Sequence, residues 1–152
     1  MVSGEVGQSG PEGNFLETMV ALEGDASCIA HARRVAAEFL TTAKERHQVH
    51  VSQRTLDLAQ LVVSELVTNA LKYAPGPVLV RLRITGGLVA VAVWDSEPVV
   101  PVARDTDAGR IGQHGLEIVQ AVARDLSVAR EAVGKRITAR LALTGTSEAR
   151  SA

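Results

Sequence analysis

SELVTNALKYA, residues Ser64 to Ala74, is the most informative stretch of the chain. With 3.6 residues per helical turn, its polar residues Glu65, Asn69 and Lys72 fall on one stripe of a helix. The opposite side of that helix is apolar along most of its length: Leu56, Val63, Leu66, Val67 and Ala70. A helix that is apolar nearly all round is expected to be buried, and buried polar groups need partners. Those partners could be a bound ion and an anionic ligand; the competing interpretation is a short, exposed polar stripe.

The three polar side chains suit phosphate chemistry. A glutamate near a reacting phosphate, here Glu65, can orient or deprotonate a hydroxyl nucleophile. The amide oxygen of Asn69 is a hard ligand suited to Mg²⁺, which is usually held by few protein groups and by the phosphates of the substrate. Lys72 offers a point charge for those phosphates.

The composition restricts the class of protein. A chain of 152 residues that is 46% hydrophobic supports one domain with its own core. A net charge of -1 and 3% aromatic residues give no reason to expect binding to nucleic acid. The single cysteine, Cys28, excludes an internal disulfide and a thiolate metal cluster. Because no long apolar run and no signal peptide are visible, we expect a soluble, cytoplasmic protein without a membrane partner.

Around the quoted helix, apolar spacing predicts one domain over residues 14–143, between disordered tails at 1–13 and 144–152. The predicted elements, in chain order, are a strand over 15–23, helices over 27–47 and 52–73, strands over 78–84 and 88–94, a helix over 116–124, and strands over 126–131 and 136–143. Gly86 and Gly87 predict a tight turn between two of these strands. Runs of helices and of strands, without strict alternation, indicate an α+β fold with helices layered on a mixed sheet.

Two further features follow the strand over 88–94, which is apolar on both faces and is therefore predicted to be central and covered on both sides. Asp95 closes this strand, where it could accept a hydrogen bond from an exocyclic amine or could simply begin a turn. The segment 95–114 after it is long, and loops of this length in a compact domain are usually functional or mobile. At its end the backbone N–H groups of GQHGL, residues 112–116, could face a phosphate just before a helix.

Four segments together resemble a known family: ELVTNALKY (65–73), WDSEP (94–98), HGLEIVQAVA (114–123) and GKRITARL (134–141). Their order and spacing are similar to those of the GHKL, or histidine-kinase-like, ATPases. Among these the chain looks most like the small stand-alone anti-sigma-factor serine kinases and their actinobacterial ATP-binding relatives. The resemblance implies the two-layer GHKL (Bergerat) ATP-binding sandwich, with ATP and Mg²⁺ as ligands.

The resemblance also implies roles for single residues. Glu65 matches the catalytic glutamate of the N box and Asn69 its Mg²⁺-binding asparagine, while Lys72 and Tyr73 match positions that approach the nucleotide. Asp95 matches the aspartate of the G1 box, which binds the adenine amino group. The segment 97–113 matches the ATP lid, and His114 matches a position beside the phosphates. Gly115 and Leu116 match residues of the G2 box at a helix N-terminus.

The function that the resemblance implies is an ATP-binding anti-sigma factor with serine/threonine-protein kinase activity. Such a protein binds a sigma factor and phosphorylates a serine on an anti-anti-sigma, or antagonist, protein, and family members suggest a homodimer. The chain departs from the family pattern where Ser96 follows Asp95 without the usual glycine, and where Gln113 replaces the first G2 glycine. These departures motivate an alternative, a kinase-inactive GHKL-fold module that regulates transcription by sequestering a partner.

Overall fold

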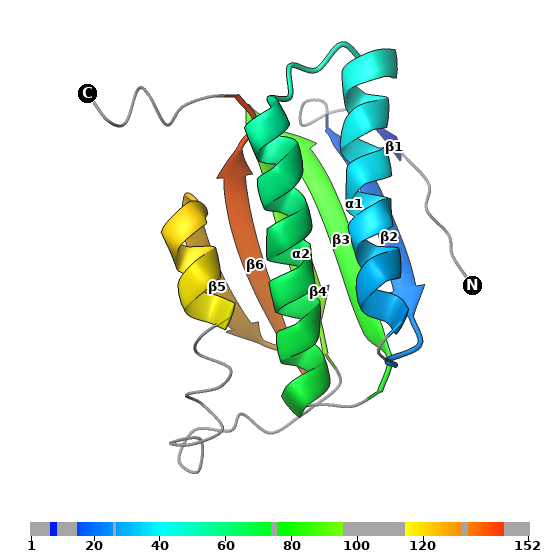
Figure 1. Ribbon diagram of the computed structural model, residues 1–152, viewed down its shortest axis with the longest axis vertical. Helices are drawn as coiled ribbons and strands as arrows, with labels where there is room; N and C mark the ends of the chain where they lie inside the picture. The colour runs from blue at the N-terminus through cyan, green and yellow to red at the C-terminus, as the bar shows by residue number, and fades with distance from the viewer. Residues whose placement is uncertain are drawn as a thin grey trace.

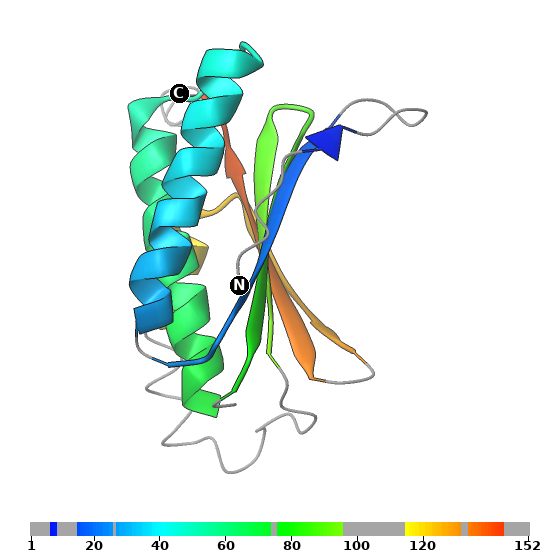
Figure 2. The same cartoon turned by 90° about the vertical axis from the view of Figure 1, so that its right-hand side faces the viewer.

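The computed structural model describes residues 7–8, 15–25, 27–73, 76–95, 115–131 and 134–144. These residues form two layers, a sheet and a set of helices on one of its faces (Figures 1 and 2). Figure 2 shows the two long helices side by side on the same face of the sheet. The predicted α+β fold class is therefore confirmed.

The observed elements follow the predicted order, with most boundaries shifted by one or two residues. They are β1 (Gly7–Gln8), β2 (Leu16–Leu22), α1 (Ser27–Arg46), α2 (Gln53–Tyr73), β3 (Val78–Thr85), β4 (Leu88–Trp94), β5 (Asp125–Arg130) and β6 (Lys135–Ala142). A further helix covers residues 115–122, between β4 and β5 in the chain.

The sheet corrects one detail of the prediction. Its strand order is β1-β2-β3-β4-β6-β5, and every strand pair among the described residues is antiparallel, so the sheet is not mixed. The reason lies in the connection from β2 to β3, which contains two helices instead of one. An antiparallel pair of helices returns the chain to the end at which β2 finished, so β3 must run back against β2.

Local chemistry explains where the long helices begin. Asp25 precedes α1, and its Oδ1 accepts hydrogen bonds from Ser27 N (3.0 Å) and Ser27 Oγ (2.6 Å). The hydroxyl of Ser27 is the main reason why the pKa of Asp25 is lowered. Ser52 precedes α2 and caps it, because its Oγ accepts a hydrogen bond from Thr55 N at 3.0 Å.

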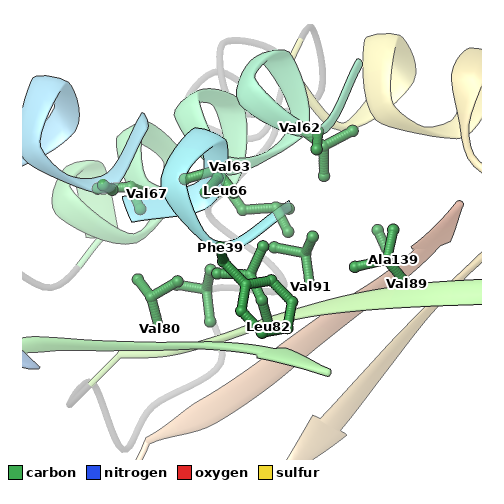
Figure 3. Close-up of a cluster of buried hydrophobic side chains, with 14 of the residues drawn as sticks. Phe39, Val62, Val63, Leu66, Val67, Val80, Leu82, Val89, Val91 and Ala139 are labelled. Atoms are coloured by element: carbon green, nitrogen blue, oxygen red, sulfur yellow. The ribbon is translucent and has the colours of Figure 1, made fainter. Parts of the chain in front are cut away.

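The core lies between the helices and the sheet (Figure 3). Alternate residues of β3 (Val78, Val80, Leu82 and Ile84) are buried and face the helices. Helix α1 packs on β2, α2 packs on β4 and β6, and both helices contact β3. Phe39 of α1 lies among valine and leucine side chains of α2, β3 and β4. The scarcity of aromatic residues thus produces a core built mainly of valine, leucine and alanine.

Strand β4 is central, as predicted, but its two faces are covered differently. Val89, Val91 and Val93 face the helices and are buried. On the other face, Trp94 lies beneath two guanidinium groups, with Arg81 Cζ 5.2 Å and Arg136 Cζ 5.8 Å from the ring centroid. On the outer face, arginine side chains of the two neighbouring strands therefore cover the ring of Trp94.

The expected tail at 1–13 contains one described element, so this prediction needs correction there. Strand β1 pairs with β2, where Gly7 faces Glu17 and Gln8 faces Leu16. The edge of β2 offers backbone N–H and C=O groups that a passing segment can pair with, even one without apolar periodicity. The other residues of 1–13, and residues 145–152, lie outside the described part of the chain.

Candidate nucleotide-binding site

The candidate site residues come from elements that end or begin at the same end of the molecule. The C-terminal ends of α2 and β4 lie there, together with the N-terminal ends of β6 and of the helix 115–122 (Figure 1). The fold thus brings together segments that are up to about half the chain apart in sequence. None of the helices in the described residues has both the length and the apolar character that a membrane span needs.

Helix α2 presents its three polar residues in three different environments. Asn69 is buried, with 4% of its surface exposed, and its side-chain Oδ1 has no hydrogen-bond partner among the described residues. Glu65 is half-buried and Lys72 is exposed. The stripe predicted from helical spacing is therefore divided by packing, because Asn69 is buried whereas Lys72, three residues later, is exposed. A buried amide oxygen without a protein partner is costly unless a ligand or an ion completes it.

Glu65 meets the start of the helix 115–122. A β-carbon at position 115 would stand 2.7 Å from Glu65 Oε1 and 3.9 Å from its Cβ, so a side chain at 115 would have to displace the end of the Glu65 side chain. The next residue, Leu116, is half-buried and packs against the core. The structure thus joins two residues that were predicted separately, Glu65 from the N-box segment and Gly115 from the G2-box segment.

Asp95 is buried at the end of β4, where it is bound to Lys135 by three hydrogen bonds. Asp95 N donates to Lys135 O (3.0 Å), which extends the pairing of β4 with β6 by one step. Lys135 N donates to Asp95 Oδ1 (3.2 Å), and Lys135 Nζ donates to Asp95 Oδ2 (2.7 Å). The side chains of Lys135 and Asp95 are only 9% and 3% exposed, so this is a buried ion pair.

Gly134 makes this arrangement possible. Its φ is +86°, a left-handed conformation that favours glycine, and a β-carbon there would overlap the backbone carbonyl of Asp95. Both Gly134 and Lys135 belong to the GKRITARL segment, yet sequence reasoning assigned no role to either residue. No local sequence signal could have found them, because it is the register of β6 on β4 that places the start of one strand beside the end of the other.

Several predicted site residues lie outside the described part of the chain. They are His114, the lid segment 97–113 with Gln113, and the side chain of Tyr73, whose backbone ends α2. Their roles remain predictions. Within the described residues, no group of three or more His, Cys, Asp or Glu residues could hold a metal ion. Asn69 Oδ1 is a buried oxygen of the kind that hard cations bind.

The comparison with protein families agrees with this geometry. The model of the histidine kinase-like ATPase domain matches residues 23–141, which is well over half of the 152-residue chain. That range contains every described site residue, from Glu65 on α2 to Lys135 on β6. The comparison with curated proteins finds no match.

Proposed function

The chain belongs to the family of histidine kinase-like ATPase domains, and on that basis we propose that it is a Mg²⁺-dependent serine/threonine-protein kinase and anti-sigma factor. In this proposal it binds a sigma factor in the cytoplasm and phosphorylates a serine on an anti-anti-sigma protein. Binding of ATP follows from the family. What we propose beyond the family is the serine acceptor of the phosphoryl group, the dependence on Mg²⁺ and the two protein partners.

The observation that carries the proposal is the buried Oδ1 of Asn69, which has no hydrogen-bond partner among the described residues. An amide oxygen held in this state is suited to a Mg²⁺ ion that also binds phosphate oxygens. Mg²⁺ and ATP would supply charge neutralisation and the phosphoryl group to be transferred. Asn69 would hold the cation, and its burial keeps the oxygen in one orientation for that purpose.

Glu65 is placed to act on the acceptor hydroxyl. It lies four residues before Asn69, one helical turn away on α2, and its carboxylate is half-buried against Gly115. A carboxylate in this position can orient a serine hydroxyl and take its proton as the phosphoryl group is transferred. Asp95 would accept the hydrogen bond from the amino group of the base, while the exposed Lys72 ammonium could approach the phosphates.

Phosphorylation gives such a protein a way to exchange partners. A phosphoserine adds about -1.5 to -2 charge at the interface of the antagonist protein, which disfavours binding unless cationic groups receive it. Release of the antagonist would leave the kinase free to hold the sigma factor. A second copy of the chain, as in a homodimer, is compatible with this cycle and is not required by it.

The first test is calorimetric titration of the chain with ATP, with and without Mg²⁺, for the wild type and Asn69→Ala. We expect binding that Mg²⁺ strengthens in the wild type and that loses this dependence in the variant. Thr68→Ala changes the preceding residue of the same helix and should keep the dependence. Binding that is equally strong with and without Mg²⁺ in all three proteins would contradict the role of Asn69.

The second test separates the kinase from a kinase-inactive, partner-binding module. The ion pair between Lys135 and Asp95 favours considering this alternative, because it already occupies the carboxylate proposed to bind the base. Phosphate transfer from labelled ATP to the antagonist protein should occur with the wild type and be lost in Glu65→Ala, while ATP still binds to the variant. Partner binding by the wild type without any transfer would support the inactive module instead.

A further inference from the structure

We propose that Lys135 is a latch on the base-binding carboxylate: its ammonium group occupies Asp95 until a ligand amine replaces it. This inference rests on the proposed function of Asp95 and goes beyond it, because it assigns a role to Lys135 in ligand selection. The latch predicts that the site discriminates nucleotides by whether their base can donate a hydrogen bond to Asp95.

The geometry restricts how a ligand could reach Asp95. Each carboxylate oxygen already accepts a hydrogen bond from Lys135: Oδ1 from the backbone N–H (3.2 Å) and Oδ2 from Nζ (2.7 Å). The Asp95 side chain is 3% exposed and that of Lys135 is 9% exposed. An incoming amine that binds Oδ2 must therefore take the place of the ammonium group, since the pair leaves almost no open surface beside the carboxylate.

The two hydrogen bonds differ in how easily they can be broken. The backbone bond to Oδ1 is fixed by the pairing of Asp95 N with Lys135 O (3.0 Å) and by the close approach of Gly134. The ammonium group, in contrast, sits at the end of four rotatable carbons and can swing away without moving the strands. Asp95 can thus keep its position and its hydrogen bond from the backbone of Lys135 while a ligand amine replaces the ammonium group.

The exchange has a consequence for specificity. A base with an exocyclic amine offers Oδ2 a donor in place of the departing ammonium. A base with a carbonyl at that position offers an acceptor, which would leave a buried carboxylate oxygen facing a second oxygen and without its cation. Nucleotides of the second kind should therefore leave the latch closed.

The alternative is that the pair is only a structural link between β4 and β6. In that case the ammonium group stays on Asp95 whether or not a nucleotide is bound, and removal of the lysine weakens the fold without selective effect on ligands. The two possibilities can be distinguished in the intact, wild-type chain.

The chain has three lysines, and Lys44 and Lys72 are both exposed. In a sample labelled with ¹⁵N-lysine, the ammonium group of Lys135 should give the signal best protected from exchange with water, because it is buried and hydrogen-bonded. We expect saturating Mg²⁺ and ATP to abolish or strongly shift this signal, and Mg²⁺ with inosine triphosphate to leave it unchanged. A protected signal that persists while calorimetry shows ATP bound would overturn the latch and leave the proposed function standing.

Binding by variants provides the second measurement. Lys135→Met removes the ammonium group and keeps the backbone donor, and we expect it to bind ATP about tenfold more tightly than the wild type, with inosine triphosphate unchanged. Arg136→Met is the matched control. It removes the same charge one residue later, on the opposite face of the strand beside Trp94, and should bind both nucleotides as the wild type does. Equal or weaker ATP binding by Lys135→Met, relative to this control, contradicts the latch.

A second variant and a melting measurement control for loss of folding. Lys135→Met removes an ammonium group from a buried carboxylate and could unfold, so Lys135→Gln, which retains a donor without the charge, is measured beside it. A ligand that binds the folded chain also raises the melting temperature of the chain. In both Lys135 variants, ATP should raise the melting temperature more than inosine triphosphate does. If the wild type and all variants remain folded and none of them binds ATP, the result contradicts the proposed function. It then also contradicts the latch, which rests on that function.

Discussion

Gly115 lies so close to Glu65 that a β-carbon at position 115 would stand 2.7 Å from the carboxylate oxygen Oε1. The two residues are 50 positions apart and belong to different helices, α2 and the helix 115–122. Their contact means that the orientation of the proposed general base depends on the absence of a side chain at the start of the second helix. It also brings a carboxylate near the first described turn of that helix, where N–H groups favour negative charge.

Gly115→Ala should therefore reduce phosphoryl transfer more than it reduces stability. The added methyl group must displace the end of the Glu65 side chain, which is flexible and can move, so the free energy of unfolding should change by no more than about 0.5 kcal/mol. Displacing the carboxylate of a general base can lower the rate of phosphoryl transfer by about tenfold to a hundredfold. Transfer rates and urea unfolding of the two proteins check both parts.

Glu117→Ala serves as the control for Gly115→Ala, because Glu117 is exposed on the same helix two residues later. It should leave both the transfer rate and the stability close to those of the wild type. A Gly115→Ala protein with an unchanged transfer rate would show that Glu65 does not need its observed position.

Gly134→Ala should destabilise the fold more than the same change at Gly87. Both glycines have a left-handed backbone, with φ of +86° and +82°, so the conformational cost of alanine is similar at the two positions, about 1 kcal/mol. They differ in space: a β-carbon at 134 would overlap the carbonyl of Asp95, whereas nothing lies within 4 Å of one at 87. We expect the overlap to add about 1–3 kcal/mol to the loss at 134.

Urea unfolding of Gly134→Ala and Gly87→Ala, compared with the wild type, measures this difference directly. The difference between the variants isolates the contact with Asp95, since the backbone strain is common to both. Equal losses would mean that β4 and β6 can separate at Asp95 without cost.

The element order could be predicted from the sequence because it depends on local periodicity. Val78, Val80, Leu82 and Ile84 alternate with less buried residues, and the pair Gly86–Gly87 ends the strand with positive φ at both positions. These patterns span only a few residues, so they can be read from the sequence without knowledge of the tertiary structure. The apolar side of α2 was predicted in the same way.

The parts that could not be predicted depend on contacts between distant segments. The pairing of Asp95 with Lys135 follows from the register of β4 on β6, and no local pattern encodes a register between strands 40 residues apart. Helical spacing likewise placed Asn69 and Lys72 on one stripe. Only the packing of α2 on the sheet shows that Asn69 is buried and Lys72 exposed.

Ser52→Ala should lower the free energy of unfolding by about 1 kcal/mol. Ser52 Oγ accepts the hydrogen bond from Thr55 N (3.0 Å) at the start of α2, and alanine would leave that N–H without its acceptor. Ser52→Asp retains an acceptor at the same position and should keep most of the stability. Urea unfolding of the two variants tests the cap, and an equal loss in both would assign the effect to the side-chain contact with Thr55 Oγ1 (2.9 Å) instead.

Cys28 should react slowly with a thiol reagent in the folded chain. Its side chain is buried at the start of α1, and burial is the main cause that raises the pKa of the thiol. Because the thiolate is the reactive form, a raised pKa means less of it at neutral pH. The native rate should therefore keep rising above about pH 8.5, where a free cysteine begins to level off.

Labelling of this single cysteine with a chromogenic disulfide, in native buffer and in urea, checks the expectation. We expect the native rate to be roughly a hundredfold lower, which corresponds to a local opening free energy of about 2.7 kcal/mol. Asp25→Ala removes the acceptor for Ser27 N and Ser27 Oγ, so it should loosen the first turn of α1 and accelerate labelling. If native and unfolded chains reacted at the same rate, the start of α1 would not be closed over Cys28, and its first turn would open freely in solution.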